Sequence, residues 1–235
     1  MSTELVRDIR HAIPVLSAGA VHDRVPSHVS TRRPSSSRRE SKELTRQALL
    51  RAALKLLSRN SFDSISLREV TREAGITPTA FYRHFDDMEE LGLVLVEESF
   101  GSLREMVRKA RSDPQMFHDA IRRSVAAVVQ HVRDHAGHMR FIARERHGGV
   151  RRLRRAINRE LQLFADELSI DLAAFPVIGE WPLDDRRMFA GLIVETMVTI
   201  SAELLDANPG EEQAIADRAV RQLRLISLGA PHWRP

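Results

Sequence analysis

The chain has 235 residues, of which 43% are hydrophobic and 29% charged, and it carries a formal net charge of +4 and no cysteine. This length allows one or two compact domains, and the lack of cysteine excludes disulfides, thiolate nucleophiles and thiolate metal sites. No uninterrupted apolar run reaches the ~18 residues that cross a bilayer, and no apolar block typical of a signal peptide stands near the N-terminus. We therefore expect a cytoplasmic protein that does not associate with a membrane.

Residues 1–40 contain three prolines, a run of serines and no sustained periodicity, which is typical of a flexible arm. Arginines outnumber acidic residues in it, at positions 24, 32, 33, 38 and 39. Two interpretations stay open for this arm. It is either a solubilising extension or a basic segment that touches a polyanion such as DNA.

The next 45 residues or so, about 41–87, predict three short helices. From Ser41 apolar residues recur with a helical period, which predicts a first helix that ends near Arg59. Ser66 and Glu69 have the spacing of a capping box, so they predict the start of a second helix, which Gly75 ends.

The third predicted helix opens with Thr77 as N-cap and Pro78 at the first helical position, and it closes near Phe85. Asp87 and Glu90 repeat the capping-box spacing and predict a fourth, long helix toward Arg111. Two short helices joined by a glycine-containing turn are typical of a helix-turn-helix DNA-binding domain.

Helical periodicity continues to the end of the chain. It predicts further helices at about 114–134, 137–146, 151–169, 184–206 and 210–229, with a loop at 171–182. No segment alternates with a period of two, so we expect no sheet. The prediction is an all-α protein of about nine helices.

The motifs of residues 48–91 resemble the DNA-binding domain of TetR-family repressors. They are Ala52-Ala53, Leu67-Arg68-Glu69-Val70, Ala74-Gly75-Ile76-Thr77 and Phe81-Tyr82-Arg83-His84-Phe85. The resemblance implies a DNA-binding domain at 41–87, a helical ligand-binding and dimerisation domain at 88–235, and a homodimer that binds a pseudo-palindromic operator in double-stranded DNA. It also implies a regulator that is not an enzyme and needs no cofactor.

Carried over position by position, the resemblance places the third helix in the major groove. The DNA-binding residues that it implies are Arg68, Thr77, Thr79, Ala80, Tyr82, Arg83 and His84. Methyl groups of Thr and Ala can contact thymine, Arg can pair with guanine, and Tyr, Thr and His can hold phosphates. Alternatively, Tyr82 and His84 pack on neighbouring helices, and Arg83 pairs with Asp86 or Glu89.

One position departs from the family pattern. Where the family usually has a lysine at the start of the fourth helix, this chain has Met88. We expect that phosphate contact to be missing, with Arg38, Arg39 or Lys42 as the residues that compensate.

Three later segments resemble the FabR and DesT branch of this family, which regulates unsaturated fatty acid synthesis: Arg140–Arg146, Arg159–Phe164 and Arg221–Ser227. The branch implies a long-chain acyl-CoA as ligand. The expected lining of its pocket is Leu95, Val125, Val128, Val129, Phe141, Leu161, Phe164 and Met197. These side chains fit an ordinary core equally well. Six arginines between 144 and 155 either face the phosphates of the ligand or pair with acidic residues such as Glu145 and Glu160.

Apolar stripes run along the helices near 184–206 and 210–229. They include Met188, Leu192, Ile200 and Leu204 in the first helix and Val220, Leu223, Ile226 and Leu228 in the second. The resemblance implies that these helices form the homodimer interface, although the core of a single chain would show the same stripes.

Other functions fit the sequence less well. His131, His135 and His138 have the spacing of one helical face, which suits a zinc sensor, but Gly137 interrupts the pattern and no acidic partner is marked, so we expect no metal site. A hydrophobic compound other than acyl-CoA, as in the control of drug efflux, is the other alternative for the ligand. No phosphate loop, nucleophile elbow or carboxylate pair favours an enzyme.

Overall fold

The computed structural model describes residues 35–111, 120–175 and 177–234, and this part of the chain is helical throughout, with no strand. The all-α prediction is confirmed. The predicted arm lies outside the described residues up to position 34. The α-helices are α1 (Ser35–Leu57), α2 (Leu67–Ala74), α3 (Pro78–Phe81), α4 (Met88–Arg111), α5 (Ala120–Asp134), α6 (Ala136–Glu145), α7 (Arg151–Asp171), α8 (Leu183–Asp206) and α9 (Glu212–Leu228).

The first helix, α1, begins at Ser35, earlier than the expected start at Ser41. Its first residues are serines, arginines and a glutamate, and residues 38–44 are exposed to solvent. Because an apolar period appears only where one face of a helix is buried, the pattern could not reveal this first turn and a half. The predicted boundary between arm and helix at residue 40 was therefore placed too late.

The helix ends around α2 follow the predicted caps. The Ser66 side chain accepts a hydrogen bond from the Glu69 amide while the Glu69 carboxylate accepts one from the Ser66 amide, so the capping box is confirmed. Gly75 ends α2 with φ of 70°, a left-handed conformation that favours glycine. Two residues later, the Thr77 side chain accepts from the Ala80 amide and caps α3.

The third helix is shorter than predicted, because α3 ends at Phe81 and not near Phe85. Beyond it the amides of Arg83 and His84 donate to the carbonyls three residues earlier, which is turn geometry. At the start of α4, Asp87 accepts from the Glu90 amide at 2.7 Å, as expected, but the Glu90 carboxylate accepts from the amide of Asp86 and not from that of Asp87. The predicted capping box is thus only half formed.

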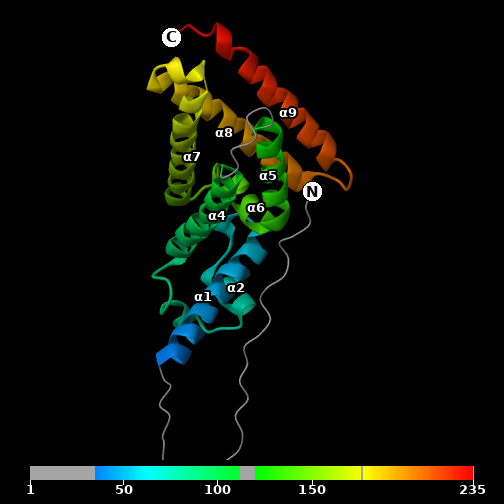
Figure 1. Ribbon diagram of the computed structural model, residues 1–235. Coiled ribbons are helices and arrows are strands. Elements are labelled where there is room, and N and C mark those ends of the chain that lie inside the picture. The colour runs from blue at the N-terminus through cyan, green and yellow to red at the C-terminus, as the bar shows by residue number, and fades with distance from the viewer. Residues whose placement is uncertain (1–34, 112–119, 176, 235) are drawn as a thin grey trace, which may run out of the picture.

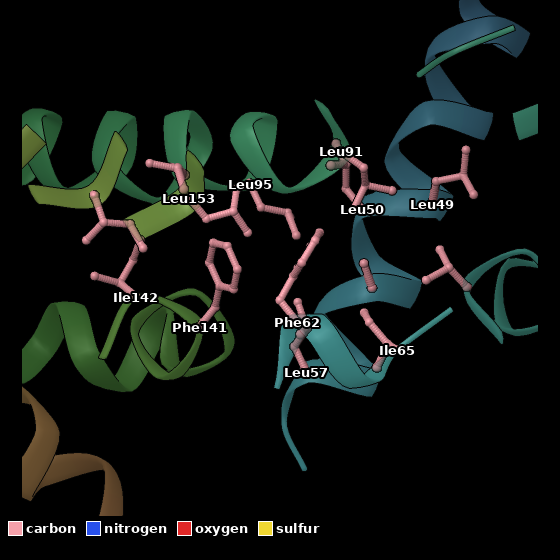
Figure 2. Packing of buried hydrophobic residues seen from close by; sticks show 14 of the residues in the cluster. Leu49, Leu50, Leu57, Phe62, Ile65, Leu91, Leu95, Phe141, Ile142 and Leu153 are labelled. Atoms are coloured by element: carbon pink, nitrogen blue, oxygen red, sulfur yellow. The ribbon is translucent and has the colours of Figure 1, made fainter. Parts of the chain in front are cut away.

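One continuous apolar core joins the first helices to the middle of the chain (Figure 2). Phe62, which follows α1, faces Phe141 of α6 with ring centroids 6.3 Å apart. Leu95 of α4 and Leu153 of α7 are fully buried beside them. Helix α4 runs from this core away from α1–α3 into the larger helical part of the molecule (Figure 1).

Helix α8 is the centre of that larger part, because it packs against α5, α6, α7 and α9. By length and composition alone, its 24 residues are long and apolar enough to cross a membrane, although charged residues interrupt the apolar stretch. In this fold only some apolar residues of α8, such as Phe189, Ile200 and Leu204, are buried against other helices. The predicted loop before α8 contains two short 3-10 turns, Leu172–Ala174 and Ile178–Glu180.

The apolar stripes of α8 and α9 divide into two faces. Ile200 and Leu204 of α8 pack with Val220 and Leu223 of α9 in a buried cluster. Other large apolar side chains on the two helices remain exposed, namely Met188, Leu192, Leu225 and Leu228. One part of the stripe is therefore the core of the single chain, and another part faces outward without a partner.

Candidate DNA-reading surface and ligand cavity

The predicted DNA-binding side chains of α2 and α3 lie mostly on the surface. Arg68, Thr77, Thr79 and Arg83 are exposed, and Tyr82 is 61% exposed. Ala80 is half-buried. These residues are therefore accessible from outside, as contact with a duplex requires.

Two phenylalanines hold this surface in place from below. Phe81 and Phe85 are buried, with ring centroids 5.5 Å apart, and the Tyr82 ring stands edge-on to Phe81 at 5.6 Å. Tyr82 is thus fixed by one ring edge while most of its surface faces solvent. Arg83 makes no ion pair within the described residues, and Glu89 lies 3.7 Å from Arg152 instead.

His84 differs from the other members of the set. It is half-buried, and its Nδ1 is enclosed without a hydrogen-bond partner among the described residues. Burial lowers the pKa of His84, and the positive charges of Lys42, Arg46 and Arg83 lower it further. The side chain is a neutral imidazole at pH 7, so it suits hydrogen bonding to DNA better than charge neutralisation.

Basic residues of α1 stand beside this surface. Lys42 and Arg46 act on His84, and the Arg46 guanidinium lies 5.4 Å from the Phe85 ring centre. Arg38, Arg39 and Lys42 are exposed on the early turns of α1. Met88, at the position where the family usually has lysine, packs against the apolar core. The α1 residues therefore remain the candidates for compensating phosphate contacts.

A cavity of about 790 Å³ lies within the larger helical part, between α4, α5, α6, α7 and α8. Most of its lining is apolar, with Phe100 and Leu103 from α4, Met139 and Ile142 from α6 and Val194 from α8 among the lining residues. A volume of this size is in the range of drug-sized ligand sites.

Half of the predicted lining residues face this cavity. Val128, Leu161, Phe164 and Met197 line it, together with Ile142 and Leu168. The other four do not, because Leu95 and Phe141 belong to the core that holds α4 against α1 and α6, and Val125 and Val129 pack with the cluster under α9. Periodicity marks a buried side of a helix but not which neighbouring helix or cavity that side meets.

The polar residues of the lining were missed from the sequence. Ser99 and Ser201 are buried in the cavity wall, where each hydroxyl donates to a carbonyl of its own helix, at 2.6 and 2.8 Å. His131 is 4% exposed and also lines the cavity. A polar residue in an otherwise apolar stripe, as Ser201 is among Met197, Ile200 and Leu204, is the sequence signal that could have identified them.

The three histidines considered for zinc are neighbours, but they do not form a metal site. The ring centroids of His131 and His135 are 4.6 Å apart and those of His135 and His138 are 6.2 Å apart. Within the described residues, no group of three His, Asp or Glu side chains has the arrangement of a metal site. His135 separates α5 from α6, so the three side chains come from two helices and not from one face.

The arginines of 144–155 do not line the cavity. Arg144 donates from one nitrogen to the carbonyls of Leu57 and Asn60, at 3.0 and 2.6 Å, and so binds the end of α1. Arg146 pairs with Glu195 of α8 at 2.8 Å, and Arg154 donates to the Gly148 carbonyl at 2.5 Å. Of the two alternatives for the cluster, contacts within the protein describe these three residues, although their partners are not Glu145 and Glu160.

Glu145, between Arg144 and Arg146 in sequence, is buried where the end of α6 meets the end of α1 and Phe62. We call this contact, together with the packing of α4 beside it, the junction. One carboxylate oxygen accepts from the Phe62 amide at 2.9 Å, and the other is enclosed with no hydrogen-bond partner among the described residues. Burial raises the pKa of Glu145, although the Phe62 bond opposes the shift. The end of α6 thus binds the helix-turn-helix part through two neighbouring side chains.

Residues 49–93 match the family model described as "Bacterial regulatory proteins, tetR family". This segment contains α2, α3 and the capped turns that present the exposed Thr, Tyr and Arg side chains. This segment is therefore a DNA-binding domain of the TetR family of transcriptional regulators. Regulators of this family are not enzymes.

Solved structures of several regulators share the fold of this chain at low sequence identity. The fatty acid degradation regulator FadR from Bacillus halodurans has a TM-score of 0.63 and 16% identity, over 76% of this chain and 94% of that one. FadR from Bacillus subtilis, solved with stearoyl-CoA, has a TM-score of 0.60 and 15% identity, over 75% and 96%. AibR, solved with isovaleryl coenzyme A and operator DNA, has a TM-score of 0.59 and 15% identity, over 80% and 98%.

Proposed function

We propose that this regulator is a repressor that binds a pseudo-palindromic operator as a homodimer in the cytoplasm and responds to a long-chain acyl-CoA, in control of fatty acid or lipid metabolism. The observation that carries the proposal is the apolar cavity of about 790 Å³, which shares α4 and α6 with the core that holds the DNA-reading helices. A long aliphatic chain meets few polar groups in such a lining, and each buried methylene contributes ~0.8 kcal/mol to binding.

The exposed edge of α3 supports the DNA half of the proposal. Thr79, Tyr82 and Arg83 are accessible, and the basic residues of α1 flank them. Side chains of these types contact base edges and phosphates in the major groove. One helix of four residues contacts few bases, so two copies related by a twofold axis are needed for a specific site.

The outer face of α8 and α9 supports the homodimer. Met188 and Leu192 on α8 and Leu225 and Leu228 on α9 are 50–70% exposed, although all four are large and apolar. An apolar surface contributed by adjacent helices suits a four-helix interface between two copies. Helix α9 and the start of α8 lie at the end of the molecule opposite α1 and α2 (Figure 1), so an interface there would leave the reading helices accessible.

Helices α4 and α6 connect the ligand to the DNA. Leu91 of α4 is buried in the core with α1, while Phe100 and Leu103 further along the same helix line the cavity. Likewise, Ile142 of α6 lines the cavity and Arg144 binds the end of α1. A ligand changes DNA affinity only if it binds the DNA-competent arrangement of these helices with a different affinity from the alternative one.

Stearoyl-CoA in B. subtilis FadR and isovaleryl-CoA in AibR show that this fold accommodates acyl groups of very different length. The apolar lining of the cavity in this chain favours the longer class. A different hydrophobic compound is the alternative.

Recovery of bound DNA across the genome would identify the operator, and fluorescence anisotropy would then measure its affinity. We expect Arg83→Ala to weaken binding at least tenfold, with an affinity that falls steeply with salt. Arg159→Ala is the matched control, since Arg159 is an exposed arginine on α7, and it should leave the affinity unchanged. Equal effects of the two variants would contradict the proposed reading surface.

Calorimetry with stearoyl-CoA tests the ligand half. Ala127 of α5 lines the cavity, whereas its neighbour Ala126 is exposed, so the two positions form a matched pair. We expect Ala127→Trp to lower the affinity at least tenfold by filling the cavity, and Ala126→Trp to leave it unchanged. Failure of every acyl-CoA to bind, or binding that leaves operator affinity untouched, would reject acyl-CoA as the effector.

A further inference from the structure

His131 is a deeply buried polar residue of the cavity lining, and unlike the buried serines it has a side-chain atom without a hydrogen-bond partner among the described residues. The side chain is 4% exposed, and its Nε2 is shut off from solvent without a hydrogen-bond partner in the described part of the chain. A buried polar atom without a partner is disfavoured, so such an atom in a cavity wall points to a ligand that supplies the partner. None of the roles assigned so far uses this atom.

The position of His131 along α5 places it at the inner end of the cavity. At the opposite end, Ser124 of α5 and Ile170 and Ala174 near the end of α7 line the cavity and are exposed. The start of α5 and the end of α7 lie at the end of the molecule away from the DNA-reading helices (Figure 1). His131 lies about 10 Å further along α5 than Ser124, at 1.5 Å per residue.

The surroundings of His131 favour an uncharged imidazole. Burial lowers the pKa of His131 to about 4; His135 and His138 lower it as well, and Asp134 acts in the opposite direction. Burial and His135 also lower the pKa of His138. At neutral pH the ring therefore carries one donor and one acceptor nitrogen and suits an uncharged hydrogen-bonding group.

The two buried serines of the lining do not offer the same recognition. Ser99 and Ser201 already donate their protons to carbonyls of their own helices, so their oxygens remain only as acceptors. A plain hydrocarbon chain at the inner end would leave Nε2 of His131 without solvent and without a partner. An oxygen on the chain at that depth removes this penalty.

We propose that His131 makes the cavity selective for a chain that carries an uncharged oxygen function, a hydroxyl or a carbonyl, near its inner end. The inference rests on the proposed function, because it takes for granted that the cavity binds a long aliphatic chain. It goes further than that function because it names a chemical feature of the ligand's aliphatic chain and the residue that recognises this feature.

The experiment compares two chains of equal length that differ in one oxygen. Calorimetry measures the dissociation constants of hexadecanoyl-CoA and 16-hydroxyhexadecanoyl-CoA for the full-length protein. We expect the hydroxylated chain to bind about tenfold more tightly, a difference of about 1.4 kcal/mol. Equal affinities, or tighter binding of the plain chain, would overturn the proposal.

Variants then assign the preference to His131. His131→Phe keeps a planar ring of similar shape and removes both nitrogens, so we expect it to abolish the preference, whereas His131→Gln should retain most of it. Phe164→Leu, elsewhere in the lining, is the control and should change both affinities alike. A preference that persists in His131→Phe would show that another group reads the oxygen.

A measurement on the unmodified protein covers the case in which His131→Phe does not fold. Nitrogen NMR of the His131 imidazole should show a shift with the hydroxylated chain and a much smaller one with the plain chain. Identical shifts would overturn the proposal.

The free fatty acids of the same pair distinguish failure of this inference from failure of the proposed function. If only the free acids bind, and the oxygen preference depends on His131, acyl-CoA is not the effector and the His131 inference stands. If acyl-CoA binds without an oxygen preference, the inference is wrong and the proposed function stands. If none of the four compounds binds, both are wrong.

Discussion

The DNA-reading helices and the ligand cavity are built by contacts of different range. Around α2 and α3 the decisive interactions join residues three or four positions apart, such as Ser66 with Glu69 and Thr77 with Ala80. The cavity instead needs five helices that are distant in sequence, from Ser99 of α4 to Ser201 of α8. Local contacts can be predicted from spacing, whereas the identity of the helix that meets another helix cannot.

The largest loss of stability is expected where α4 packs against Phe62 and Leu153, at the junction between the two regions. Gly92 of α4 lies where an added Cβ would stand 2.7 Å from the Phe62 ring and 2.9 Å from Leu153. We expect Gly92→Leu to lower the free energy of unfolding by about 3 kcal/mol, because a well-packed core resists extra volume. Chemical denaturation followed by circular dichroism measures the change.

Gly101 of the same helix provides the matched control. An added Cβ there would meet nothing within 4 Å, so Gly101→Leu should raise stability by about 0.5–1 kcal/mol through helix propensity. If both glycine variants lost the same stability, the close approach at Gly92 would not be the cause.

Because the contacts around α2 and α3 are local, most of the DNA-reading region could be predicted from the sequence. The motifs of 48–91 led to the family, and the caps at Ser66, Gly75 and Thr77 are confirmed. The start of α1 and the end of α3 were wrong, because an exposed helical turn leaves no apolar period and because turn bonds replace the helix after Phe81. The predicted homodimer and the FabR and DesT resemblance stay predictions.

In the region around the ligand cavity, the bounds of the helices were predicted better than the contacts between them. The ranges 184–206 and 210–229 lie within a few residues of α8 and α9. Yet Leu95 and Phe141 lie in the core at the junction, whereas the polar residues His131 and Ser201 line the cavity. Which side of a buried helix faces a void depends on the whole packing, which spacing within one helix does not encode.

The hydrogen bonds that α6 makes to the end of α1 offer a second test of the junction. Arg144→Ala removes the donors to the Leu57 and Asn60 carbonyls, and we expect it to lower the free energy of unfolding by about 1.5 kcal/mol. Arg155→Ala, an exposed arginine on α7, should change it by less than about 0.5 kcal/mol. A similar loss in both variants would assign no special role to Arg144.

Removal of a local helix cap should lower the free energy of unfolding by less than disruption of the packing at the junction. Ser66→Ala removes the side chain that accepts from the Glu69 amide, and we expect a loss of about 1 kcal/mol. Ser64→Ala makes the same chemical change just before the helix, where the hydroxyl donates to the Ser61 carbonyl and caps nothing. We expect that control to lie within about 0.5 kcal/mol of the unmodified protein. A Ser66 loss no larger than that would show that the cap is redundant.

The smallest effect is a dependence on pH that belongs to the junction alone. Since burial raises the pKa of Glu145, the folded protein holds that proton more tightly than the unfolded chain does. The unmodified protein should therefore lose stability relative to Glu145→Gln as the pH rises from the ordinary carboxyl pKa through the raised pKa of Glu145. Below that range the carboxyl group is neutral in both the folded and the unfolded state, so the difference in stability stays constant. Glu180→Gln, at an exposed position outside both regions, should show no such trend. Denaturation curves across this pH range measure the free energy of unfolding of both proteins. If the difference between Glu145→Gln and the unmodified protein does not change with pH, the buried carboxylate is stabilised by groups other than the Phe62 amide.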